Sequence, residues 1–476
     1  MSDEPAAPRS LDIPNELWQA TPLEMRVIFV QREERLRELE RRLGTNSTNS
    51  SKPPSSDGPQ VDRSPKAPPS GKRPGGQKGN PGTYRPIVPV EEVDVVRDHV
   101  PQVCRACGDP LCAVDESGPV FTRHQVTEIP AMRATVTEHR LHERRCASCG
   151  CATQAKLPPG ISRSAFGPRV QAHIACLTGR YRMSRREVRE YLDQAWAVRL
   201  SLGSVHAIEQ EMSRALHAPY EAAWESVKAA SVRNVDETTW RVGRKRRWLW
   251  GAVSSNATAF TIAASRGAVV LRERFGEALR SGFFCSDRYA AYGTIEMERR
   301  GICHAHLKRD FTRIEQLGGY AGFLGYALLL EHRKVFALVR ERRAEAIAEA
   351  AFAERIVPLQ ERIRGLLEQG RACTNAQASG MCANILRHWE AMWNFVSVPG
   401  LEPTNNRAER ALRKAVLWRK GSFGTRSTGG SEFAERMLTV AATCRQQGTR
   451  LLEFLTAALE ASRLGVAAPA LVPAAS

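Results

Sequence analysis

The spacing of hydrophobic residues changes several times along the chain, and each change predicts a different kind of structure. In residues 21–43, Phe29, Leu36 and Leu43 recur every seven residues in a charged sequence, which predicts a helix with a thin coiled-coil seam. Such a helix either pairs with another chain or packs locally as a solvated helix. The next stretch, up to residue 90, is rich in serine, proline and glycine and predicts a flexible basic linker.

Beyond the linker, helical and strand-like patterns alternate. Residues 165–217 have the spacing of amphipathic helices. Short apolar runs typical of strands follow at Val232–Val235, Trp248–Ser254, Ala259–Ala264 and Gly282–Ser286, with a helix near 267–280. Helical spacing returns at 320–395, 404–420 and 431–463. These alternations predict a multidomain α+β protein.

The charge of the chain indicates a polyanionic partner. The 476 residues have a formal net charge of +18, and the basic residues are concentrated in 45–90, 161–250 and 400–450. The alternative is a basic protein with no such partner. No apolar run reaches the roughly 18 residues of a membrane span, and the N-terminus lacks the pattern of a signal peptide. Twelve cysteines without a secretion signal then predict a cytoplasmic protein.

Two CxxC pairs predict a zinc-binding module of the zinc-ribbon type. They are Cys104 with Cys107 and Cys146 with Cys149. Each pair offers two thiolates from one tight turn, and two turns complete the tetrahedral shell of one structural Zn²⁺. A redox dithiol and unliganded cysteines are the alternatives. The long stretch between the pairs should form hairpins, for which Val120–Val126 and Arg133–His139 are the candidates.

The helical middle of the chain has the pattern of a helix-turn-helix. Ser184 and Glu187 form a capping box at the start of one helix, and Ser201 marks the start of a second one. Several arginines lie nearby, so the pair of helices could bind DNA. The residues that would then face the groove are Ser204, His206 and Gln210. Any two-helix hairpin shows the same pattern, so a purely structural pair stays open.

Three carboxylates occupy the settings that a nuclease needs. Asp236 and Asp287 each end a strand-like run, and Glu409 lies on a helix. This order matches a ribonuclease H-like sheet, in which strand ends hold two acids side by side and a helix brings the third. Oxygen-only ligands suit Mg²⁺ or Mn²⁺. Two such ions could drive an in-line displacement at a phosphodiester.

Polar residues near these acids are predicted to support them. Asn405 and Asn406 precede Glu409 by four and three residues and would share its helix face, although capping of the helix is the alternative reading. His306 follows Asp287 closely and is either an active-site contact or a structural histidine. Five basic residues on the same helix could meet phosphates, namely Arg410, Arg413, Lys414, Arg419 and Lys420. A basic hairpin tip could also grip DNA, or be a solvated turn, and it contains Arg244, Lys245, Arg246 and Arg247.

Together these motifs resemble the transposases of the insertion sequence 66 family, nearly from end to end. The shared elements include the Asn49–Asp57 stretch, the paired CxxC, Asp236–Thr238, Ser286–Tyr292 and Asn405–Arg410. The resemblance implies DDE transposase chemistry, with Asp236, Asp287 and Glu409 as ligands of two Mg²⁺ or Mn²⁺ ions. It also implies an α-helical insertion before Glu409, which residues 320–395 would form. We expect a nucleoid-associated homo-oligomer that binds element ends and target DNA, with accessory proteins of the same element as further candidate partners.

Two departures and two other readings accompany this resemblance. Many relatives have an aspartate where this chain has Thr404, and a glycine where it has Arg288. Neither change removes a presumed ligand, although Arg288 could crowd the site. A non-catalytic zinc and helix-turn-helix DNA-binding protein derived from a transposase is one alternative. A metal-dependent nuclease without strand transfer is the other.

The predicted domains follow from these elements. They are an N-terminal helix (1–44), a linker (45–89), the CxxC module (90–160), a helical DNA-binding region (161–227), the catalytic core in two parts (228–319 and 398–425), a helical insertion between them (320–397) and C-terminal helices with a tail (426–476).

Overall fold

The computed structural model describes residues 86–111, 120–130, 132–162 and 164–473, together with α1 (Asn15–Ala20) and isolated positions from 22 to 57. The predicted coiled-coil positions Phe29, Leu36 and Leu43, and most of the linker, lie outside these residues. The chain divides into two units, of which the smaller is Asp62–Thr135 and the larger contains Val136–Ser476. In the parts of the chain covered by the structure, no helix is both long and apolar enough to span a membrane.

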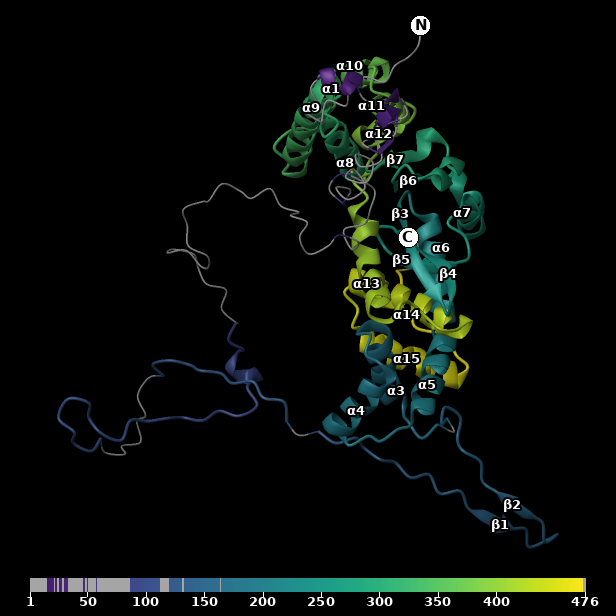
Figure 1. Cartoon of the computed structure of the whole chain (residues 1–476). Coiled ribbons are helices and arrows are strands. Elements are labelled where there is room, and N and C mark those ends of the chain that lie inside the picture. Colours follow the sequence, from purple (N-terminus) through teal and green to yellow (C-terminus); the bar gives the residue numbers. More distant parts are fainter. Residues whose placement is uncertain are drawn as a thin grey trace. The chain divides into compact units, whose positions relative to one another are not determined.

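A five-stranded mixed sheet forms the centre of the larger unit (Figure 1). Its strands are β3 (Val232–Val242), β4 (Lys245–Val253), β5 (Thr258–Ala263), β6 (Phe283–Ser286) and β7 (Arg300–Ile302). They lie in the order β5-β4-β3-β6-β7, with β4 antiparallel to both its neighbours and β6 parallel to β3 and β7. The predicted strands are therefore confirmed.

One predicted boundary in this sheet is wrong. β3 does not end before Asp236 but continues to Val242, where it pairs with Lys245 of β4. The polar run Asp236–Thr239 is held in the strand because its backbone is paired with β4, although polar residues such as aspartate have a low strand propensity.

Helices cover both faces of the sheet. On one face, α13 (Asn406–Ser422) packs Leu412 and Ala415 against Trp240, Leu249 and Phe260. The other face carries α6 (His217–Ala229) and α7 (Ala268–Phe275), whose apolar residues form a second core. Because side chains alternate along a strand, Asp236 lies on the α13 face with Trp240, whereas Val235 belongs to the second core.

The edge strand β5 is bonded to α14 (Thr428–Gln446) through side chains of that helix. The N–H groups of Thr258, Phe260 and Ile262 donate to Thr443 Oγ1, Thr439 Oγ1 and Glu435 Oε1, over 3.1, 3.0 and 2.9 Å. The acceptors are four residues apart on α14 and therefore share one helix face. They meet alternate residues of β5, whose N–H groups point to the same side.

A helical insertion with its own core follows β7. It contains α8 (His304–Glu315), α9 (Gly319–Arg343), α10 (Glu349–Ala372), α11 (Ala376–Leu386) and α12 (Trp389–Trp393), with a short 3-10 turn at Asn394–Val396. The core of these helices continues onto Cys285 and Ile302 of the sheet. This segment confirms that the predicted region 320–397 is helical.

The region before the sheet is also helical, as the sequence predicts. It contains α3 (Pro168–Ala175), the π-helical turn η3 (Cys176–Arg180), α4 (Arg185–Trp196) and α5 (Leu202–Ala215), and α15 (Leu451–Leu464) packs against α3 and α5. The capping box at Ser184 and Glu187 is confirmed, with both hydrogen bonds present. Ser201 caps α5 by accepting a hydrogen bond from the Ser204 N–H.

The stretches around the two CxxC pairs contain little regular structure. The described parts of 120–139 contain no strand, so the hairpins predicted at Val120–Val126 and Arg133–His139 are wrong. Instead, β1 (Glu143–Arg145) and β2 (Ala152–Gln154) form a short antiparallel pair around the second CxxC. Short 3-10 turns occupy Val90–Glu92, Gly276–Arg280, Ala290–Thr294 and Met297–Arg299.

Candidate active site

The fold brings the three predicted carboxylates together. β3 and β6 are parallel, with Asn234 level with Cys285, so the same register two residues further on aligns Asp236 with Asp287 just beyond β6. Glu409 lies in the first turn of α13, the helix that packs on the same face of β3 as Asp236. The sheet therefore supplies two acids from adjacent strands, and the covering helix supplies the third.

The electrostatics of Asp236 reflect this convergence. Its side chain is partly buried, and this desolvation raises the pKa of its carboxyl group well above the ordinary value. The nearby carboxylates of Glu237, Asp287 and Glu409 raise it further, against one hydrogen bond from the Glu237 N–H at 2.9 Å. Asp287 is held by the N–H of Tyr289 at 2.8 Å. A group of acids in this position is unfavourable without a cation.

His306 and Cys303 border the same cluster. The Nδ1 atom of His306 lies 3.9 Å from Glu409 Oε1, and neither atom has a hydrogen-bond partner although both are buried. Ligand atoms of Cys303, His306 and Glu409 all lie within 4.8 Å of one another. Burial raises the pKa of the Cys303 thiol to about 11 and lowers the pKa of His306, so a neutral thiol and a neutral imidazole face the carboxylates.

Asn405 differs from both of the roles predicted for it. Its side chain is 1% exposed, makes no capping hydrogen bond and does not turn toward Glu409. Instead, its amide donates to the Val235 carbonyl at 2.8 Å and accepts from the Asn234 amide at 3.1 Å. Asn405 therefore fixes the start of α13 to β3, while Asn406 is exposed at the first position of the helix.

Two further side chains near the acids have partners that the sequence did not predict. Glu237 is bound by Arg266 at 2.8 Å and by the Tyr292 hydroxyl at 2.5 Å, on the face of β3 opposite Asp236. Arg288 pairs with Asp310 of α8, and its Nε and Nη1 atoms are buried without partners. The sequence signal for Glu237 was its adjacency to Asp236, and the signal for Arg288 was its place where many relatives have glycine.

The basic residues predicted on α13 fall into two groups. Arg410, Arg413 and Lys420 are exposed. Arg419 is not free to meet phosphates, because its guanidinium group donates to the carbonyl and the hydroxyl of Thr239 in β3. Its prediction as a DNA contact is therefore replaced by a structural role, and burial lowers the pKa of its side chain.

The predicted basic hairpin tip exists at the turn between β3 and β4. Gly243 adopts a left-handed φ of 58°, as a tight two-residue turn requires, and Arg244, Lys245 and Arg246 are exposed around it. Arg246 stacks over the Trp248 ring at 4.8 Å. Arg247 is partly exposed.

The three residues predicted to face a DNA groove lie on α5 with different surroundings. Ser204 is partly buried at the first turn and hydrogen-bonds to the Ser201 hydroxyl. His206 is exposed, and its Nδ1 atom lies 3.0 Å from Arg185 of α4. Gln210 is partly buried where α5 packs on α14.

Each CxxC pair forms a tight turn of the same design. In the first, the Gly108 N–H donates to the Cys104 carbonyl at 2.9 Å, and in the second the Gly150 N–H donates to the Cys146 carbonyl at 2.9 Å. Both glycines have left-handed φ angles. Backbone N–H groups of Cys107 and Ala106 lower the pKa of Cys104, and those of Cys149 and Ser148 lower the pKa of Cys146. Each turn therefore favours thiolates.

Comparison with known proteins gives two family matches and two relatives. A family described as Transposase IS66 family matches residues 163–433, more than half of the chain, and a Family of unknown function (DUF6444) matches residues 8–86. The uncharacterized protein y4qI of Sinorhizobium fredii (strain NBRC 101917 / NGR234) is 26% identical over 241 residues, which cover 45% of this chain and 43% of that protein. The uncharacterized protein y4hP of the same strain is 27% identical over 158 residues, 30% of this chain and 29% of that protein. The chain spans less than half the length of either relative.

Proposed function

The chain belongs to the IS66 family of transposases, and from this premise we propose that it cuts DNA at the ends of an insertion element and joins the freed 3′-hydroxyl to target DNA. Asp236, Asp287 and Glu409 carry the reaction. The observation behind the proposal is that Asp287 and Glu409 lie close enough to Asp236 for their charges to raise its pKa.

The sheet supports a ribonuclease H-like core. Numbered along the chain, its first three strands form an antiparallel meander, and the fourth and fifth extend the sheet in parallel from the first. This arrangement puts acids from the first and fourth strands side by side, and α13 adds the third from the face of the sheet. The helical insertion enters between Asp287 and Glu409 without interrupting the sheet.

The acids fit a pair of hard divalent cations. All three offer oxygen atoms, which Mg²⁺ and Mn²⁺ prefer, and Glu409 Oε1 is buried without a partner. When bound, such ions would activate the attacking water or 3′-hydroxyl and neutralise the leaving oxygen. The protein's own part is to hold the carboxylates in place through the Tyr289 and Glu237 N–H groups and the Asn405 anchor.

His306 is the candidate contact to the phosphodiester. Its ring is neutral because burial lowers its pKa, so one nitrogen can donate a hydrogen bond while the other accepts. Nδ1 is buried without a partner beside Glu409. A phosphate oxygen placed at the acids would be a suitable partner for it. Cys303, with a neutral thiol that accepts from the Asn405 N–H at 3.2 Å, is a structural neighbour instead of a ligand.

DNA binding is proposed for the exposed basic tip of the β3–β4 hairpin and for the α4–α5 pair. Arg244 lies in the turn and Lys245 begins β4, and both are exposed where a phosphate backbone could reach them. His206 on α5 is exposed as well. Both ends of an element must be held during transposition, which favours a homo-oligomer.

We also propose, from the sequence of the two CxxC turns, that they bind one structural Zn²⁺. Each turn has the backbone geometry and the lowered cysteine pKa that a thiolate ligand needs. Replacing Cys104 and Cys107 by serine should remove zinc from the purified protein and impair folding or end binding. Full zinc content in that variant, measured by mass spectrometry, would contradict the assignment.

The proposed chemistry is tested with Glu409→Gln and Asp287→Asn. Both should lose Mg²⁺-dependent cleavage of a duplex that carries the terminal repeat of the element, while keeping its binding affinity within a few-fold, because neither residue lies on the proposed DNA-binding surfaces. Glu432→Gln, at an exposed position of α14, is the matched control and should cleave normally. Cleavage by either active-site variant at the wild-type rate would refute the assignment. Binding without cleavage by the wild-type protein would favour the non-catalytic alternative.

A further inference from the structure

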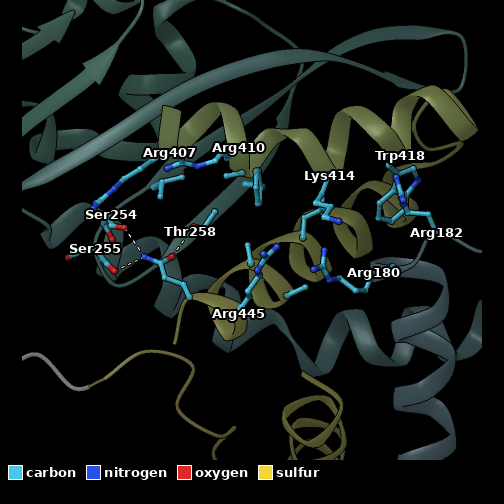
Figure 2. Close-up of a pocket in the computed structure, with 18 residues that line it drawn as sticks. Arg180, Arg182, Ser254, Ser255, Thr258, Arg407, Arg410, Lys414, Trp418 and Arg445 are labelled. Carbon is cyan, nitrogen blue, oxygen red and sulfur yellow. Dashed lines mark hydrogen bonds between the residues drawn. The ribbon is translucent and has the colours of Figure 1, made fainter. Parts of the chain in front are cut away.

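A cavity of about 560 Å³ lies between η3, the turn that joins β4 to β5, α13 and α14 (Figure 2). Six cationic side chains line it, and they come from three separate parts of the chain. They are Arg180, Arg182, Arg407, Arg410, Lys414 and Arg445. In Figure 2 they surround the cavity from α13 on one side and from η3 and α14 on the other.

Within the described part of the chain, no acid balances the positive charge of this cavity. None of the described carboxylates lines the cavity or forms an ion pair with any of the six cations. Repulsion by Arg180 lowers the pKa of Lys414, and Arg182 and Arg445 add to it. Six like charges around a small space oppose folding unless an anion joins them.

The backbone is irregular where it delivers two of these cations. Arg180 ends η3, a π-helical turn, which is rare outside functional sites. Arg182 has a φ of 66°, in the left-handed region that a residue with a side chain adopts only at a cost of about 1–2 kcal/mol. Local strain of this kind is retained mainly where it serves a function.

The cavity and the three acids lie on different sides of α13. Arg407, Arg410 and Lys414 are three and four residues apart and so share one face, which lines the cavity. Glu409 points toward β3 and the other two acids. On the cavity floor, Gln446 bonds to the carbonyls of Ser254 and Ser255, at 2.8 and 2.6 Å, and fixes the β4–β5 turn.

We propose that this cavity binds backbone phosphates of the DNA substrate at nucleotides away from the bond that is cut. The inference rests on the proposed function for the identity of the DNA, but it assigns a separate site to phosphate binding. The required chemistry is a cluster of phosphate oxygens, which guanidinium and ammonium groups bind through charge-assisted hydrogen bonds. A DNA strand supplies successive phosphates that are one nucleotide apart, whereas a free polyphosphate supplies its phosphates in one small ion.

The test replaces Arg180, Lys414 and Arg445 by glutamine together, and Lys414 alone. The control variant, Arg272→Gln/Arg333→Gln/Arg340→Gln, has the same net charge, and its three exposed cations lie on α7 and α9 away from the cavity. Binding of a fluorescent terminal-repeat duplex is measured between 50 and 200 mM salt. Over this fourfold range of salt, each lost phosphate contact should reduce the change in Kd by about 3.5-fold.

The cavity variants should show this reduction, whereas the control should keep the wild-type salt dependence. Equal behaviour of cavity and control variants, with melting curves that show all of them folded, would overturn the proposal. Calorimetric titration with tripolyphosphate separates the two phosphate sources: binding of this ion that is lost in the cavity variants, with DNA binding unchanged, would also overturn it. Glu409→Gln should keep the wild-type salt slope, so failure of the proposed chemistry is distinguishable from failure of the cavity.

Discussion

Replacing Asn405 by alanine should destabilise the protein and loosen the helix that carries Glu409. The Asn405 side chain is 1% exposed and holds two partners in β3, the Val235 carbonyl and the Asn234 amide. The substitution leaves both buried without a partner, and each such loss costs about 1–3 kcal/mol. We therefore expect a decrease of about 2–6 kcal/mol in the free energy of unfolding, measured in urea.

The same substitution should reduce cleavage of terminal-repeat DNA at least tenfold, because Glu409 follows Asn405 by one helical turn and relies on it for position. Asn406→Ala is the matched control, since Asn406 is exposed beside it. Its effect should stay within about 0.5 kcal/mol. The double variant Asn234→Ala/Asn405→Ala should cost less than the two single variants added together, because it leaves fewer unpaired groups. If Asn405→Ala were as stable and active as Asn406→Ala, the anchoring role would be wrong.

Three other predictions concern the packing of α9, the acid cluster and a buried histidine. Gly325→Ala should lower the free energy of unfolding in urea by about 1–3 kcal/mol, because the added Cβ would lie 2.6 Å from the Glu315 Cα. Its control, Gly365→Ala, has open space around the added Cβ and should stabilise the protein by about 0.5–1 kcal/mol. Equal effects of the two substitutions would refute the close packing of α9 on α8. Asp236→Asn should raise the melting temperature of metal-free protein, because it removes a partly buried acid beside three others. It should also abolish the stabilisation by Mg²⁺, and a lower melting temperature in EDTA would contradict this reasoning. Burial lowers the pKa of His332 to about 3 in the folded protein, against about 6.5 in the unfolded chain. The contribution of His332 to the free energy of unfolding is therefore complete above pH 6.5. It is lost as the pH falls toward 3, by up to about 1.4 kcal/mol per pH unit. His332→Phe should flatten the pH dependence of urea unfolding below pH 6.5, and an unchanged slope would count against that cause.

Local signals predicted much of the fold. The capping box at Ser184 and Glu187 depends on residues three apart, and it is present. The strands near 232, 248, 259 and 283 were readable because their apolar runs are short and lie between turn residues. The polar end of β3 could not be predicted, because Asp236–Thr239 has the composition of a loop and is held in the strand by its pairing with β4.

The details of the site depend on distant partners and could not be read locally. Asn405 was predicted to support Glu409, or alternatively to cap the helix, because both uses depend on neighbours in sequence. Its partners instead lie about 170 residues earlier in β3. Arg419 looked like a free cation, but Thr239 accepts its hydrogen bonds from another element. The basic cavity joins Arg180 to Lys414 and Arg445, and no periodicity connects positions so far apart.

The contact between α14 and β5 has a consequence for how copies of the chain can associate. An edge strand with a free row of N–H groups recruits strands from other molecules and promotes aggregation. Here Thr443, Thr439 and Glu435 already accept those N–H groups, and the opposite edge, β7, is only three residues long. Sheet extension between copies is therefore blocked at β5 unless α14 detaches. A chain truncated before Thr428 would uncover this edge, lose the core residues of α14 and α15, and should aggregate. These C-terminal residues should therefore keep the protein soluble, although they supply none of the three clustered acids.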